Sequence, residues 1–170
     1  MFQQINHKLE LTGDRIELFP ISLNYLHDFH EYSIISELYT YLEFSPFKSL
    51  NESREYLMKL MSRSSQPTAQ YFYIYEKSIK KVIGTIGVFD IHENRLSAEI
   101  GYGISPKYWR KDYFKETLTL FIDHLFNEIS LNRIVAKTSA TNIASIRALK
   151  KFGFKTEGQM REFYRIDNKK

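Results

Sequence analysis

The segment 99–116 most constrains the fold of this chain, because a strand there leads through a charged turn directly into a helix. Its sequence is EIGYGISPKYWRKDYFKE. The first turn of a helix directs unpaired backbone N–H groups at one point, where an anion such as a phosphate can bind. Such turns ordinarily carry glycines, which let the ligand approach the backbone, but residues 109–114 (WRKDYF) contain none. The segment therefore predicts an anion-binding turn of unusual sequence.

The composition narrows the class of protein. A chain of 170 residues with 43% hydrophobic residues can form a single domain over residues 1–170 with its own core. The absence of Cys excludes a disulfide framework, a thiol nucleophile and a Cys-based metal site. A net charge of +4 suits an anionic small molecule, but it is too mild and too evenly spread to predict a nucleic-acid partner.

The chain shows no targeting or membrane-spanning pattern. No apolar run is long enough to cross a bilayer, and residues 1–7 do not resemble a signal peptide. We therefore expect a cytoplasmic protein with no membrane partner, as a monomer or a homodimer.

Hydrophobic periodicity predicts an α+β (mixed α/β) domain built around one sheet. Strands are expected over 15–19, 71–75, 82–89, 96–104 and 133–138, with further extended chain over 154–158 and 160–166. Helices are expected over 23–41 with a break near Ser33, over 51–62 with Asn51 as its cap, over 113–129, and over 142–152 before Gly153. Within 96–104, Ala98, Ile100 and Tyr102 share one face, and Glu99, Gly101 and Gly103 share the other.

Four motifs occur in a familiar order. They are IGTIG at 83–87, AEIGY at 98–102 followed by SPKYW at 105–109, LNRI at 131–134, and NIASIRALKKFGF at 142–154. On these motifs the chain resembles, over nearly its whole length, the GNAT N-acetyltransferases, in particular the branch that contains the ribosomal-protein N-terminal acetyltransferases. The resemblance implies a mostly antiparallel mixed sheet with flanking helices and a splayed pair of parallel strands. It also implies that acetyl-CoA is the co-substrate and that the acceptor is a primary amine, either a protein N-terminus or a small amine.

The resemblance further implies where the cofactor binds. The pantetheine arm would lie in a gap beside the strand that ends near Ile104, contacting Tyr102, Gly103 and Ile104. The diphosphate would lie on the backbone amides of the turn, and Asn142 would contact the cofactor. The residues implied for the turn are Arg110, Lys111, Asp112, Tyr113, Phe114 and Lys115. Gly101 and Gly103 would leave one face of the strand bare for the arm, although glycines in a strand also mark a bulge or close packing.

Two residues are candidates for catalysis. Amide formation from a thioester requires a neutral amine and protonation of the leaving thiolate. Glu99, on the strand beside the cofactor, is the candidate base, and the alternative is an ordinary ion-paired carboxylate. The Ser of an Asn-x-x-Ser pattern can take the second role in related enzymes, so the resemblance implies Ser145 as the candidate proton donor. The alternative is a first-turn serine in a helix capped by Asn142. No metal site is expected, since His27 and His30 lack a third ligand and suit a solvated surface.

The turn departs from the family pattern, which has small residues where this chain has Arg110, Asp112 and Phe114. A side chain in a left-handed conformation costs about 1–2 kcal/mol. Phe114 would obstruct the phosphates unless its ring turned into the core with Leu118 and Phe121. These features keep open a second possibility, a GNAT-fold binding or regulatory module with weakened or lost catalysis.

Asp112 is expected to weaken the anion site further. A carboxylate about 4 Å from a phosphate would be repelled by about 4 kcal/mol at an effective dielectric of 20. Asp112 is also expected to cap the helix through the N–H groups of Phe114 and Lys115, in competition with a diphosphate.

The C-terminus is the second departure. The family continues beyond the expected turn at 167–170 with one more strand. Either this sequence stops short of that strand or the last hairpin is missing, and a missing strand would expose a sheet edge that a partner chain could cover.

Overall fold

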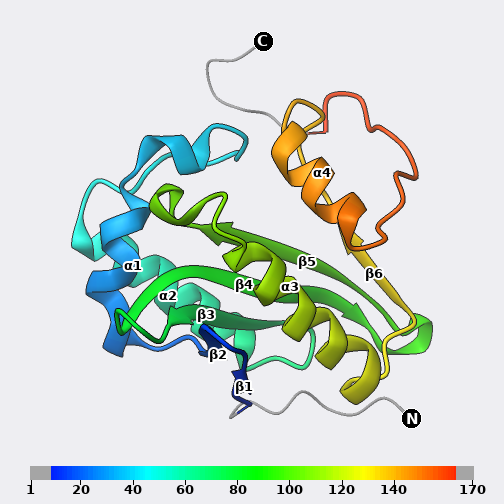
Figure 1. Ribbon diagram of the computed structural model, residues 1–170, viewed down its shortest axis with the longest axis horizontal. Coiled ribbons are helices and arrows are strands. Elements are labelled where there is room, and N and C mark those ends of the chain that lie inside the picture. The colour runs from blue at the N-terminus through cyan, green and yellow to red at the C-terminus, as the bar shows by residue number, and fades with distance from the viewer. Residues whose placement is uncertain (1–8, 164–170) are drawn as a thin grey trace.

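The computed structural model describes residues 9–163, which form one six-stranded sheet with helices on both faces (Figure 1). The strands are β1 (Leu11–Thr12), β2 (Ile16–Pro20), β3 (Gln70–Glu76), β4 (Lys81–His92), β5 (Ser97–Ile104) and β6 (Arg133–Ala136). The α-helices are α1 (Leu26–Ser33), α2 (Leu50–Ser64), α3 (Tyr113–Asp123) and α4 (Ile143–Lys151). The spatial order follows the sequence, with antiparallel neighbours from β1 to β5 and a parallel β5–β6 pair. This confirms the predicted α+β fold with its mostly antiparallel mixed sheet.

The sheet is buried on both faces, which explains the aromatic and β-branched sequence of β3. Phe72 and Ile74 pack into a core with the stripe of α3, including Phe121. Tyr71 and Tyr73 point to the opposite face and pack with α1 and α2. The chain thus forms a helix–sheet–helix sandwich, in which Ala98, Ile100 and Ile104 of β5 are buried and the opposite face of β5 is partly buried.

The parallel strands β5 and β6 separate along their length. Their pairing runs from Ser97 opposite Arg133 to Ile100 opposite Ala136 and stops there. β5 itself continues, still paired with β4, until Ile104 lies opposite Gly84. The edge of β5 that faces away from β4 therefore has no partner strand over residues 101–104 among the described residues. This is the splayed pair that the resemblance implies.

Several element boundaries differ from the sequence prediction. α2 begins at Leu50, and its cap is Ser49 rather than Asn51: the Ser49 hydroxyl accepts the Glu52 N–H at 3.2 Å. The helix expected over 113–129 ends at Asp123 and continues as one π turn, His124–Glu128. β1 was not predicted, because two residues are too short to carry a periodic signal.

The prediction of strands after Gly153 was wrong as far as the structure describes the chain. Residues 154–163 contain no strand, because no described strand lies beside them to complete a ladder. Arg133 ties the segment to β6 through a two-bond ion pair with Glu157, between side chains rather than backbones. Residues 164–166 of the predicted strand and the turn expected at 167–170 lie outside the described residues.

Candidate active site

The open edge of β5 forms the centre of the candidate site. It carries two glycines, and close packing explains only one of them. A Cβ on Gly101 would lie 3.0 Å from the Phe89 ring, so close packing accounts for this glycine. A Cβ on Gly103 would meet nothing nearer than Leu38, at 3.6 Å. Packing therefore does not explain Gly103, which leaves the backbone next to Ile104 uncovered on that face.

The turn before α3 adopts a glycine-like backbone without glycine. Arg110 has a φ of 60° and Asp112 a φ of 62°, both in the left-handed region. These are two of the positions where the family pattern has small residues, so the expected backbone strain is present. Both side chains are exposed, as are those of Lys111 and Lys115. Three cations therefore surround the start of α3, together with one carboxylate.

The prediction that the Asp112 carboxylate caps α3 was wrong. Asp112 does occupy the position before Tyr113, but its side chain makes no capping hydrogen bond. A capping side chain requires an extended backbone, and the left-handed backbone of Asp112 turns its carboxylate away. Within residues 9–163, no group accepts the N–H of Phe114 or Lys115 in its place. These donors remain available to an anion.

Phe114 does not obstruct the turn. Its ring lies 4.3 Å from the Tyr102 ring, centroid to centroid, and packs against the core that contains Leu118 and Phe121. The Tyr113 ring packs elsewhere, beneath the Arg15 guanidinium at 4.5 Å and edge-on to Tyr108. Both rings are therefore held by packing contacts.

Glu99 is ion-paired. Its Oε2 lies 2.5 Å from Nζ of Lys137, which directly follows β6, and its side chain is 15% exposed. Glu99 lies on the α1–α2 face of β5, opposite Phe89 on β4. The contacts of Glu99 are therefore those of an ion-paired strand carboxylate, which was the alternative to a catalytic base. The pairing engages Oε2, and Oε1 can still receive a proton.

Ser145 meets a partner that the sequence did not indicate. Its Oγ lies 2.6 Å from the hydroxyl of Tyr102, so α4 is hydrogen-bonded to β5 where β5 and β6 separate. Burial raises the pKa of Tyr102, and the hydrogen bond to Ser145 opposes that rise. The Asn142 side chain accepts the Ser145 N–H at 3.1 Å, which confirms Asn142 as the cap of α4.

Three residues outside the predicted set complete the site. Lys137 pairs with Glu99, and Arg15 and Glu116 anchor the turn to β2. Lys137 could have been found from the register of the parallel strands, since it directly follows the pair Ile100–Ala136. Arg15 and Glu116 are 101 positions apart, and no local pattern connects them. Among the described residues, no group of His, Cys, Asp and Glu is arranged to hold a metal ion.

The decisive comparison is with protein families. The family model described as "Acetyltransferase (GNAT) domain" matches residues 15–155, which include the splayed strands, the turn and α4. The chain belongs to the GNAT acetyltransferase family. GNAT enzymes use acetyl-CoA.

Individual relatives agree with the GNAT assignment. The chain is 32% identical over 127 residues to the "Uncharacterized N-acetyltransferase p20" of Bacillus licheniformis, covering 75% of this chain and 71% of that one. It is 28% identical over 103 residues to the "[Ribosomal protein uS5]-alanine N-acetyltransferase" of Escherichia coli, covering 60% and 53%.

A solved structure shares the GNAT fold. Spermidine N-acetyltransferase from Vibrio cholerae, determined in complex with CoA and spermine, superposes with a TM-score of 0.77 at 20% identity. The match covers 91% of this chain and 89% of that one. As for membranes, no helix within residues 9–163 is long and apolar enough to span a bilayer.

Proposed function

We propose that this GNAT protein transfers an acetyl group from acetyl-CoA to a primary amine, either a protein N-terminus or a small amine, in the cytoplasm. One observation carries the proposal: β5 loses its partner strand beyond Ile100, between a carboxylate on one face and a hydroxyl pair on the other. Relatives named for both kinds of acceptor occur, one for a ribosomal-protein alanine and one for spermidine.

The cofactor would be held mainly by backbone groups. Gly103 and Ile104 on the open edge of β5 would line its arm. The N–H groups of the first turn of α3, at Phe114 and Lys115, would bind its diphosphate, with the cations of Arg110 and Lys111 nearby. The thioester supplies the acetyl group. Because Asn142 already uses its side-chain oxygen as a helix cap, its amide nitrogen would be the group left for the cofactor.

Glu99 would act as the base. Its carboxylate lies on the α1–α2 face of β5 and would accept a proton from the incoming ammonium, directly or through water. The neutral amine would then form the new C–N bond as the C–S bond breaks, and the nitrogen would release its second proton to water as the amide forms. Lys137 holds the carboxylate in place through Oε2.

Ser145 would return a proton to the leaving thiolate from the opposite face of β5. A serine alone is a poor acid, but here its Oγ would share a proton with the Tyr102 hydroxyl, which lies 2.6 Å away. A phenol ionises near pH 10, far more readily than an alcohol. Ser145 would transfer its proton to sulfur and regain one from Tyr102, and solvent would reprotonate Tyr102 with one of the two protons that the ammonium released.

The test is acetyl transfer to a panel of primary amines and short peptides, with Glu99→Gln as the variant. We expect kcat/KM to fall at least about 100-fold, the range of general-base catalysis, while the acetyl-CoA Kd changes less than about twofold. Glu93→Gln, at an exposed carboxylate in the turn before β5, is the matched control and should retain full activity. Equal activity of wild type and Glu99→Gln would remove Glu99 from the mechanism. No transfer to any amine by the wild type would contradict the proposed function.

A further inference from the structure

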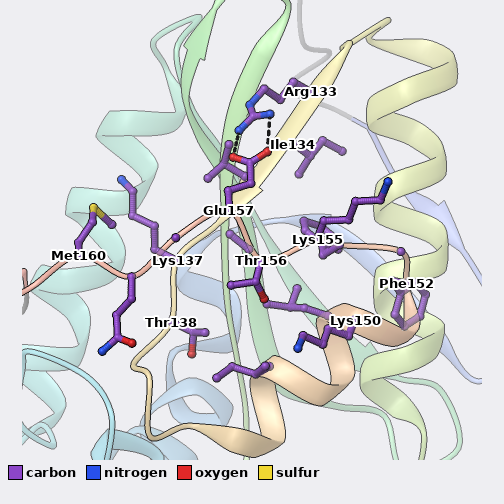
Figure 2. Close-up of a pocket in the computed structure, with 18 of the residues that line it drawn as sticks. Arg133, Ile134, Lys137, Thr138, Lys150, Phe152, Lys155, Thr156, Glu157 and Met160 are labelled. Atoms are coloured by element: carbon purple, nitrogen blue, oxygen red, sulfur yellow. Dashed lines mark hydrogen bonds and ion pairs between the residues drawn. The ribbon is translucent and has the colours of Figure 1, made fainter.

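A groove runs along the outer side of β6 and is not part of the cofactor gap. Its volume is about 1130 Å³, and it lies between β6, α4 and the segment 154–163 (Figure 2). In Figure 1 this segment arches away from the sheet beyond β6. The groove therefore has a strand as one wall and a non-strand segment as the other.

The strand wall has an unsatisfied edge. β6 pairs only with β5 among the described residues, so the backbone N–H and C=O groups on its other edge face the groove without a ladder partner. Exposed strand edges bind extended peptides by main-chain hydrogen bonds, with side-chain pockets at alternate positions. Met160 and Phe163 on the opposite wall are 55% and 48% exposed, and they offer apolar surface for such side chains.

The lining carries an excess of positive charge. Arg133, Lys137, Lys150 and Lys155 line the groove, against two acidic residues, Glu157 and Glu162. Arg133 and Glu157 neutralise each other. The ammonium groups of Lys150 and Lys155 form no ion pair within residues 9–163. A peptide that fits this lining is acidic.

The lining of the groove includes the ion-pair partner of the candidate base. Lys137 lines the groove, and its ammonium pairs with Glu99 at 2.5 Å. A chain lying along β6 toward Lys137 would thus end one side chain away from the carboxylate. The groove and the transfer site are therefore connected through a single residue.

We propose that this groove binds an extended acidic peptide along β6, and that the amino terminus of that peptide is the acceptor amine. The proposal rests on the proposed transferase function and selects the protein N-terminus from its two acceptor classes. Lys150 and Lys155 attract the acidic side chains, and the β6 edge binds the backbone.

The experiment measures peptide binding to the full chain without catalysis. The probe is a peptide of about ten residues with a free amino terminus, several glutamates and a fluorophore at its C-terminus, followed by fluorescence anisotropy. We expect it to bind about tenfold more tightly than its glutamine counterpart. The double variant Lys150→Glu/Lys155→Glu should remove that preference, whereas Lys48→Glu/Lys59→Glu, at two exposed lysines outside the groove, should not. Equal binding of the acidic and glutamine peptides would overturn the proposal.

A second probe tests the strand edge. N-methylation of alternate peptide residues should abolish binding in one of the two possible sets and spare the other, because only one set would donate to β6. If both sets bind as the parent does, the peptide does not pair with β6 and the proposal fails.

Tight peptide binding without acetylation would support the groove but contradict the transferase function. Acetylation of small amines without peptide binding would support the transferase function but contradict peptide binding in the groove. A stable dimer that the peptide does not dissociate would assign the edge to a second copy and overturn the proposal.

Discussion

Arg15 and Glu116 form an ion pair that fastens the start of β2 to the first turn of α3. Nε of Arg15 donates to Oε2 of Glu116 at 2.9 Å, while Oε1 accepts the backbone N–H groups of Arg15 at 2.7 Å and Ile16 at 3.2 Å. Nη1 of Arg15 also donates to the Lys111 carbonyl at 3.0 Å. The pair therefore holds the proposed diphosphate turn from outside, by contacts that do not depend on glycine.

Glu116→Ala should destabilise the fold more than an ordinary surface ion pair would. Burial raises the pKa of Glu116, but the hydrogen bonds from Arg15 and Ile16 outweigh it and hold the pKa below its usual value. Loss of the carboxylate leaves two backbone donors without acceptors, at a cost of about 1–3 kcal/mol. Urea unfolding measures the difference.

Glu31→Ala is the control for Glu116→Ala. Glu31 pairs with Lys81 and Lys107, but all three side chains are about half exposed, so the cost should stay below about 1 kcal/mol. Equal losses for the two variants would contradict the anchoring role of Glu116.

Replacing Arg110 by glycine should stabilise the fold, although glycine usually destabilises a protein when it replaces another residue. Arg110→Gly removes the strain of a left-handed side chain and should raise the free energy of unfolding by about 0.5–1 kcal/mol. Lys115→Gly, inside the first turn of α3, should lower it by about 1 kcal/mol. Denaturation curves of both variants measure these changes in the free energy of unfolding. A decrease of equal size in both would show that Arg110 stores no strain.

Asp112→Asn should tighten acetyl-CoA binding. Asparagine tolerates the left-handed backbone and removes the only negative charge on the turn between Trp109 and Lys115. Because the position is exposed, we expect a gain of about three- to tenfold in affinity, reduced by salt. Calorimetry at two ionic strengths measures it. Unchanged affinity would mean that the carboxylate lies too far from the bound phosphates to matter.

Tyr102→Phe should slow transfer while leaving cofactor binding nearly intact. The substitution retains the ring that packs on Phe114 but removes the hydroxyl that meets Ser145. We expect kcat to fall about 10–100-fold, with less than a threefold change in the acetyl-CoA Kd. Because the two hydroxyls act as a unit, Ser145→Ala should add little to Tyr102→Phe. Additive losses would contradict the shared proton.

His124 should make the fold less stable in mild acid. It lies buried on the π turn, and burial lowers its pKa, although Glu128 with Oε2 at 3.1 Å opposes the shift. The native state therefore favours the neutral imidazole. Stability from this residue is fully present above the ordinary pKa of about 6.5 and is lost as the pH falls through the lowered native value. Urea unfolding between pH 5 and 8 should show this decline in the wild type but not in His124→Gln, and equal declines would assign it to other groups.

The sequence predicted those parts of the fold that local patterns determine. Alternation revealed both faces of β5, and Asn142 with Gly153 marked the ends of α4, because caps and periodicity act over a few residues. The strand–turn–helix order of residues 99–116 was also predictable, since these elements follow one another in the chain. The left-handed conformations at Arg110 and Asp112 followed from the family pattern of small residues.

Long-range geometry could not be predicted in the same way. The sequence suggested a cap at Asp112, but whether a carboxylate reaches its N–H groups depends on the backbone angles at the cap. The Tyr102–Ser145 contact depends on where α4 packs over β5, and the Arg15 anchor joins segments distant in the chain. Residues 154–163 were expected to be strands, but strand sequence alone does not supply a partner.

Acetyl-CoA binding by the full chain decides whether this GNAT fold holds the family's cofactor. A ligand that binds only the folded state, at about 100 times its Kd, should add about 2.7 kcal/mol to the stability. For a chain of this size we predict a rise in Tm of about 5 °C or more, with Glu99→Gln responding as the wild type does. No rise at millimolar acetyl-CoA would contradict the account and favour a GNAT fold that has lost its cofactor.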